Sequence, residues 1–124
     1  MLLRINNAGY LYKSISLDDG KTWSEIEKTD IPNPNNKPKL IKTNDGTIIL
    51  LNTPNSKVGM INRNPLEVWV SYDDMKTWSK KIRVLDFPSS YLSYPDGIYD
   101  EESKSVKFSF ELNRHDVYYV DVEI

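Results

Sequence analysis

A histidine and an aspartate, which are side chains used for proton transfer, lie side by side near the end of the chain. His115 follows Arg114 and precedes Asp116, and the pKa of an ordinary histidine lies close enough to neutrality for general acid or base chemistry. A serine triad needs a further partner, which sequence spacing alone does not identify. With one histidine and no cysteine, the chain has no ligand spacing typical of zinc. We interpret these residues as a polar turn and expect neither a metal nor a cofactor.

Arginine offers a second kind of chemistry, the recognition of an anion. Arg63 lies in a polar loop just before an alternating apolar run, and Pro65 stiffens the approach to that run. A guanidinium matches a carboxylate in bidentate geometry and stays charged at any working pH. Tyr94 precedes Pro95, which predicts an extended backbone at Tyr94.

The charge balance excludes one large class of partner. Lysine and arginine total 16 against 18 for aspartate and glutamate, which gives a formal net charge of −2. The chain lacks the basic field that holds phosphate backbones, so we expect no nucleic-acid partner. No apolar run approaches the roughly 20 residues that a membrane helix needs, so we expect no membrane partner. The absence of cysteine suits the cytosol, the periplasm and the exterior equally.

Two copies of one pattern, S-x-D-D-x-K-T-W, organise the elements that must position these side chains. They occupy residues 16–23 and 71–78. In each copy, serine and aspartate side chains can bond the nearby backbone of a turn. The pattern therefore predicts a hairpin turn followed by a strand, with the tryptophan packing the turn against the core. Met75 replaces Gly20 in the second copy, so that turn either bends differently or holds a methionine at positive φ.

Short apolar and alternating runs separated by turn signals fill the rest of the chain. We count about ten short strands and no helical period longer than a turn or two, so we predict an all-β fold. Hairpins recur every ~50 residues, which is typical of β-propeller blades. We predict a partial β-propeller in a single domain, residues 1–124. It would comprise a blade remnant at 1–31, a complete four-stranded antiparallel blade at 38–86 and an incomplete terminal blade at 91–124, about two and a half blades.

An open arc of blades would expose apolar faces, which are uncommon on soluble monomers. We therefore expect the chain either to form a homo-oligomer that closes a ring or to be part of a longer chain.

The repeat resembles the Asp-box, S-x-D-x-G-x-T-W, of the sialidase (neuraminidase) superfamily. Residues 16–23 match it at every specified position, and residues 71–78 depart only at Met75. Further parts of the chain follow the C-terminal half of a six-bladed sialidase-like propeller, so that the likeness covers essentially the whole chain. These parts are Pro32-Asn33-Pro34-Asn35, Asp45-Gly46, Arg63-Asn64-Pro65-Leu66 and Ser93-Tyr94-Pro95. In such propellers the Asp-box ties the turn between a blade's third and fourth strands and does no chemistry.

The resemblance implies an exo-acting glycoside hydrolase of acidic sugars. In that superfamily three arginines bind the substrate carboxylate, a tyrosine assisted by a glutamate is the nucleophile, and an aspartate is the acid/base. Arg4 falls on the second arginine, Arg63 on the third, within R-x-P-L, and Tyr94 on the nucleophile. The first arginine, the aspartate and the glutamate belong upstream of Arg4 in that family. We therefore expect a carbohydrate-binding segment that is inactive alone.

Several alternatives remain open at this point. The chain could be a non-catalytic Asp-box module for glycan or protein binding, and related propellers differ in the glycoside they accept. Arg4 could be an ordinary strand-end or rim arginine, and Tyr91 is the nearest rival of Tyr94. We expect a periplasmic or secreted location if the chain is part of a longer sialidase, and a cytoplasmic one otherwise.

Overall fold

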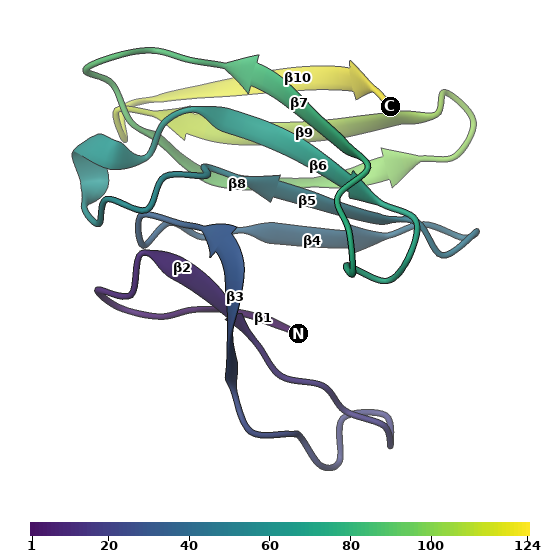
Figure 1. Cartoon of the computed structure of the whole chain (residues 1–124). Helices are drawn as coiled ribbons and strands as arrows, with labels where there is room; N and C mark the ends of the chain where they lie inside the picture. The colour runs from purple at the N-terminus through teal and green to yellow at the C-terminus, as the bar shows by residue number, and fades with distance from the viewer.

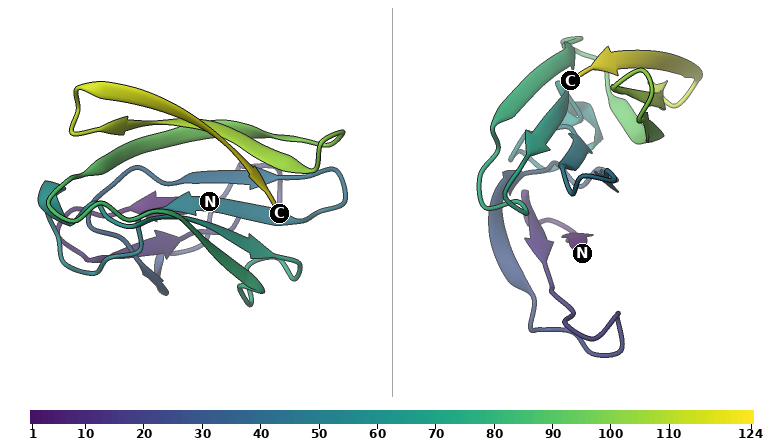
Figure 2. Two further views of the ribbon diagram at one scale, coloured as in Figure 1. Left: turned by 90° about the horizontal axis from the view of Figure 1, so that it is seen from above. Right: turned by 90° about the vertical axis from the view of Figure 1, so that its right-hand side faces the viewer.

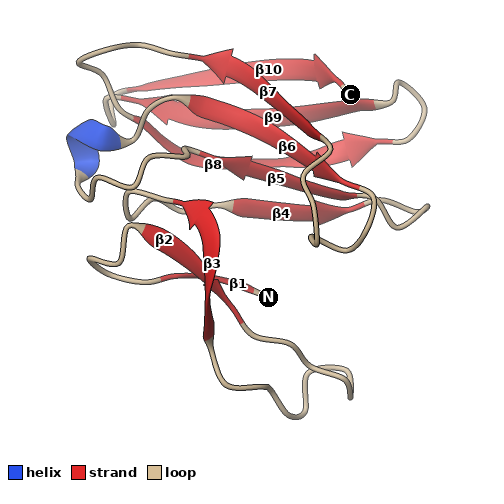
Figure 3. Cartoon of the chain, viewed as in Figure 1, coloured by secondary structure: helices blue, strands red, loops and turns tan.

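Three antiparallel β-sheets make up the computed structural model of the protein, which describes all 124 residues (Figures 1 and 3). Strands that follow each other in the chain pair within each sheet. The first sheet contains β1 (Leu2–Arg4), β2 (Tyr10–Lys13) and β3 (Glu27–Pro32). The second contains β4 (Lys39–Lys42), β5 (Ile48–Asn52), β6 (Leu66–Ser71) and β7 (Lys80–Leu85). The third contains β8 (Leu92–Asp100), β9 (Ser105–Leu112) and β10 (Asp116–Glu123). The predicted all-β class is confirmed.

The second sheet lies between the other two (Figure 2). In β5, Ile49 and Leu51 point into a core shared with the third sheet, and Leu50 points into a core shared with the first. Successive strand residues face opposite sides, so a strand covered on both faces is apolar throughout. This explains why every residue of β5 is buried.

Two hydrophobic clusters hold the sheets together. The larger joins the second and third sheets and contains Ile49, Leu51, Leu66, Val68, Leu92, Val106, Phe108 and Phe110. The smaller joins the first and second sheets and contains Leu11, Ile31, Leu50 and Trp69. At the edge strand β10, Val120 and Val122 pack against the larger cluster, and Tyr118 stacks on Phe110. Tyr118, Val120 and Val122 therefore form the inner face of this last strand.

The two Asp-box turns have the same internal hydrogen bonds. Asp18 accepts the Thr22 backbone N–H at 2.8 Å and the Thr22 hydroxyl at 2.7 Å. Asp73 accepts the Thr77 backbone N–H at 2.9 Å and the Thr77 hydroxyl at 2.6 Å. These bonds, those from the threonine hydroxyls first, lower the pKa of both carboxyl groups to about 2. Each turn is therefore stabilised by hydrogen bonds between its own residues.

Met75 adopts a φ of 66°, in the same region as Gly20 at 85°. Of the two alternatives, the second is therefore the right one: the turn keeps its shape and holds a methionine at positive φ.

The two repeat tryptophans differ, and the expectation for Trp23 is wrong. Trp78 meets Trp69 edge-on between the first and second sheets, with ring centroids 5.6 Å apart. Trp23 is 48% exposed and donates from its indole nitrogen to the Gly20 carbonyl oxygen. No sheet covers the far side of the first sheet, so the ring that would pack there stays half in solvent.

The loops at the opposite end of the sheets from the Asp-boxes meet one another (Figure 1). The loop after β1 contacts the loop after β5, where a Cβ on Gly9 would lie 2.5 Å from the Ser56 carbonyl oxygen. The loop after β5 in turn bonds the loop after β3, through Gly59 N–H and the Pro34 carbonyl oxygen. This loop cluster carries the side chains considered next.

Candidate functional site

Arg63 is buried at the meeting point of these loops. Its side chain donates to the Ser93 hydroxyl at 3.0 Å through Nη1 and to the Asn35 carbonyl oxygen at 2.8 Å through Nη2. The residue is only 7% exposed, and its Nε has no acceptor. No carboxylate forms an ion pair with it. A buried charge without a counter-ion is unfavourable, so this guanidinium can accept an anion from outside the chain.

Tyr94 lies next to Arg63, in a break of the third sheet. The register between β8 and β9 shifts between Ser93 and Asp96, as at a β-bulge. Tyr94 has a φ of 53°, so the extended conformation expected before Pro95 is wrong. Its N–H points to the Asn36 side-chain oxygen at 3.4 Å. The bulge and this contact override the local preference of a residue before proline, at a cost of about 1–3 kcal/mol.

Three of the chain's four arginines gather around Tyr94. The Cζ atoms of Arg63 and Arg114 lie 5.5 and 5.6 Å from the centre of its ring. The neighbouring guanidinium groups of Arg4 and then Arg63, together with the charges of Arg63 and Arg114, hold the pKa of the Tyr94 hydroxyl below its usual value. The structure therefore brings together all three site residues expected from the sequence, Arg4, Arg63 and Tyr94. It adds Arg114, which we had interpreted only as part of a turn.

Tyr91, the rival of Tyr94, has a different environment. Its backbone N–H and carbonyl oxygen both bond Asn113, and neither Arg63 nor Arg114 lies over its ring. The arginine cluster thus favours Tyr94 over Tyr91.

A buried network of asparagines supports the site from below. Asn33 donates to the Asn52 side-chain oxygen at 2.8 Å, and Asn36 donates to the Leu92 carbonyl oxygen at 2.8 Å and to the Thr53 hydroxyl at 3.0 Å. In the sequence, Pro32-Asn33-Pro34-Asn35 of this segment stood out only as one part of a family resemblance. Asn33 and Asn36 are instead almost completely buried. Because buried amides must be hydrogen-bonded, their bonds fix the position of this segment.

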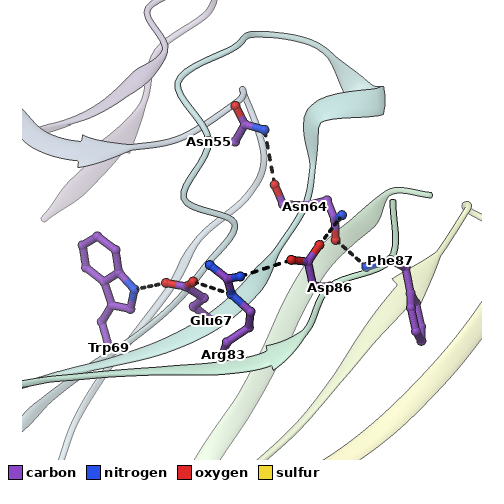
Figure 4. Close-up of polar contacts among 7 residues, drawn as sticks. All are labelled: Asn55, Asn64, Glu67, Trp69, Arg83, Asp86 and Phe87. Carbon is purple, nitrogen blue, oxygen red and sulfur yellow. Dashed lines mark hydrogen bonds and ion pairs between the residues drawn. The ribbon is translucent and has the colours of Figure 1, made fainter. Parts of the chain in front are cut away.

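A second polar chain fixes the loop that carries Arg63 (Figure 4). Asn64 donates to Asp86 at 3.0 Å, and the other Asp86 oxygen accepts Arg83 at 3.2 Å. Arg83 also bonds Glu67, which accepts the Trp69 indole N–H at 2.7 Å. This series of hydrogen bonds connects Trp69 in the core to Asn64, the residue next to Arg63. Arg83, the fourth arginine, is therefore paired with carboxylates and lies outside the site.

Other features lie away from this cluster. A cavity of about 770 Å³ opens at the Asp-box end, lined in part by Trp23, Met75 and Trp78. The ring of His115 is exposed and contacts only Asp116, at 3.0 Å. No group of three or more histidine, cysteine or acidic side chains is arranged to hold a metal ion. The only helical segment, η1 (Met60–Asn62), is far too short to cross a membrane.

Comparison with known proteins identifies the family. A family model described as a BNR repeat-like domain matches residues 1–106. A search of the curated proteins finds no match. The matched region includes both Asp-boxes, Arg4, Arg63 and Tyr94. Because the match covers well over half of the sequence, the chain belongs to the BNR repeat-like domain family, the repeat family of the sialidases.

Proposed function

We propose that the chain is a segment of a sialidase-like β-propeller that binds the carboxylate of an acidic sugar through Arg4 and Arg63. Its three sheets would be blades or parts of blades, with the boundaries 1–31, 38–86 and 91–124. The strand counts of three, four and three support this assignment. The position of the second Asp-box, between β6 and β7 of the four-stranded sheet, also supports it.

The observation that carries the proposal is the excess of positive charge around one tyrosine. Arg4, Arg63 and Arg114 approach Tyr94, and Arg63 is buried with a free Nε and no carboxylate partner. An ordinary structural arginine is paired with acidic side chains, as Arg83 is. A planar carboxylate is the partner that guanidinium groups bind best.

Tyr94 would face the sugar as the nucleophile, since its neutral hydroxyl does not repel an anionic ligand as a carboxylate would. Hydrolysis also needs an acid/base and a group that assists the tyrosine. Asp96, two residues after Tyr94, pairs with Lys37 and Lys39, and Glu111 lies beside Arg114. The chain by itself would therefore bind an acidic sugar without cleaving it.

Calorimetry with N-acetylneuraminate tests the carboxylate contact. We expect saturable binding of the acid and none of its methyl ester, which has no charge at that position. Replacing Arg63 by lysine removes bidentate hydrogen bonds to a charged group, worth about 1.5–3 kcal/mol, and should weaken binding about 10- to 100-fold. The matched control, Arg83→Lys, should bind as the parent does.

Two results would contradict the proposal. One is equal binding of the acid and the ester. The other is an Arg63→Lys variant that binds the acid as tightly as the parent while Arg83→Lys does not. Either result would favour the alternative, a non-catalytic Asp-box module that contacts glycans or proteins through another surface. The chain should not hydrolyse a fluorogenic sialoside. Measurable turnover would contradict the proposal that the chain alone binds the sugar without cleaving it.

A further inference from the structure

A single asparagine fixes the β9–β10 turn against the segment that leads into Tyr94. The Asn113 N–H donates to the Tyr91 carbonyl oxygen at 2.9 Å, and its side-chain oxygen accepts the Tyr91 N–H at 3.0 Å. Its amide nitrogen also approaches the Ser90 hydroxyl, at 3.4 Å. In the sequence, Asn113 is 22 positions from Tyr91 and 23 positions from Ser90. They set the place of the next residue, Arg114.

Arg114 is held in an unfavourable backbone conformation at this turn. Its φ is 58°, after 53° at Asn113. Asparagine adopts this region more readily than arginine does, so the conformation of Arg114 costs about 1–2 kcal/mol. Strain of this kind persists only where the surrounding contacts impose it, and it is frequent at functional sites.

The guanidinium of Arg114 faces the tyrosine ring rather than a strong counter-ion. Its Cζ lies 5.6 Å from the ring centre of Tyr94, within the range of a cation–π contact. Its one acidic neighbour is Glu111, with the Nε and Oε2 atoms 3.9 Å apart, at the limit of an ion pair. No strong carboxylate partner therefore competes with the contact between Arg114 and the Tyr94 ring.

The groups that face Tyr94 come from three elements. Arg4 ends β1, Arg63 precedes β6 and Arg114 lies in the β9–β10 turn. All three are cations, and each favours the phenolate over the phenol. Glu111, a carboxylate of β9, lies beside Arg114.

We propose that Arg114 is a positioning residue for Tyr94, whose guanidinium holds the ring in place and offsets the negative charge of the phenolate. This role deepens the proposed function and rests on it, because a half-buried nucleophilic tyrosine must be both oriented and ionisable. The contact itself can be tested without any sugar.

The test is a pH titration of Tyr94 by NMR with tyrosines labelled at the ring carbon that bears the hydroxyl. The chain has eight tyrosines, and Tyr94→Phe assigns the signal. In Arg114→Gln, which keeps length and loses charge, the midpoint should rise toward that of an ordinary tyrosine. Arg114→Lys should restore much of the parent midpoint, and the neighbouring His115→Ala should leave it unchanged.

An unchanged Tyr94 midpoint in Arg114→Gln would overturn the positioning role. So would a midpoint in Arg114→Lys as high as that in Arg114→Gln. The signals of the other seven tyrosines report whether each variant is folded, and Arg114→Ala provides a second uncharged variant.

Sugar binding separates this inference from the proposed function. If the Tyr94 midpoint depends on Arg114 but N-acetylneuraminate does not bind the parent, the proposed function fails and the charge contact stands. If the sugar binds through Arg63 and the Tyr94 midpoint does not change in Arg114→Gln, only the positioning role fails.

Discussion

Replacing Met75 by glycine should stabilise the protein, because it removes a strained residue from the second Asp-box turn. Asp74 and Met75 have φ values of 58° and 66°, and Asp19 and Gly20 in the first turn have 57° and 85°. Two central residues at positive φ are the arrangement of a type I′ turn, for which Asp-Gly is a preferred pair. The first turn has that pair and the second does not.

The size of the effect follows from two opposing terms. A side chain in the left-handed region costs about 1–2 kcal/mol, and this cost disappears in Met75→Gly. Glycine adds unfolded-state freedom that costs about 0.5–1 kcal/mol. The Met75 N–H bond to the Ser71 hydroxyl, at 2.9 Å, is a backbone contact that glycine keeps. We therefore expect a net gain of up to about 1.5 kcal/mol, centred on ~0.75 kcal/mol, in the free energy of unfolding.

Urea unfolding followed by tryptophan fluorescence measures this gain as a rise in the midpoint at constant slope. The matched control is Gly20→Ala in the first turn, which places a side chain at a φ of 85° and should lower stability by a similar amount. A Met75→Gly variant that is no more stable than the parent, alongside a Gly20→Ala variant that loses nothing, would refute the reasoning.

Further predictions concern the core and the Asp-box carboxylates. Phe108→Ala should cost about 3–5 kcal/mol in the same assay, because the side chain is fully buried between two sheets; a loss below about 1 kcal/mol would contradict this packing. Gly97→Ala should destabilise by about 1–3 kcal/mol or more, because its Cβ would lie 2.2 Å from the Lys107 carbonyl oxygen; a variant as stable as the parent would contradict the close pairing of β8 and β9. Folding lowers the pKa of Asp18 and Asp73 from 3.8 to about 2, so their contribution to stability is present above pH 3.8 and is lost as the pH falls through about 2. Asp73→Asn should flatten this decline in urea midpoints measured between pH 5 and 2, and an unaltered decline would count against it.

Local turn chemistry made the strand layout predictable. The sequence Asn44-Asp45-Gly46 predicts a tight turn, and Gly46 has the expected positive φ of 90° between β4 and β5. The continuous apolar run Ile48-Ile49-Leu50-Leu51 indicates a strand buried on both faces, and every residue of β5 is buried. Both features depend on residues that are neighbours in the chain.

The site depends on contacts between distant residues, which explains what the sequence did not reveal. The backbone of Tyr94 is set by a bulge and by Asn36, 58 positions away. The place of Arg114 is set through Asn113 by Tyr91. Trp23 is half exposed because no sheet covers the far side of the first sheet. Residue types alone therefore did not identify Arg4, Arg63 and Tyr94 as a site. A family resemblance was needed as well.

The side-chain Nε–H signal of Arg63 in an NMR spectrum tests the central claim most directly. This donor is buried and has no acceptor in the chain, and Arg63→Lys assigns its signal. On titration with N-acetylneuraminate we predict a saturable shift of this signal that the methyl ester does not reproduce. An Arg63 signal that stays in place at saturating sugar, or that responds equally to the uncharged ester, would contradict carboxylate recognition by this arginine.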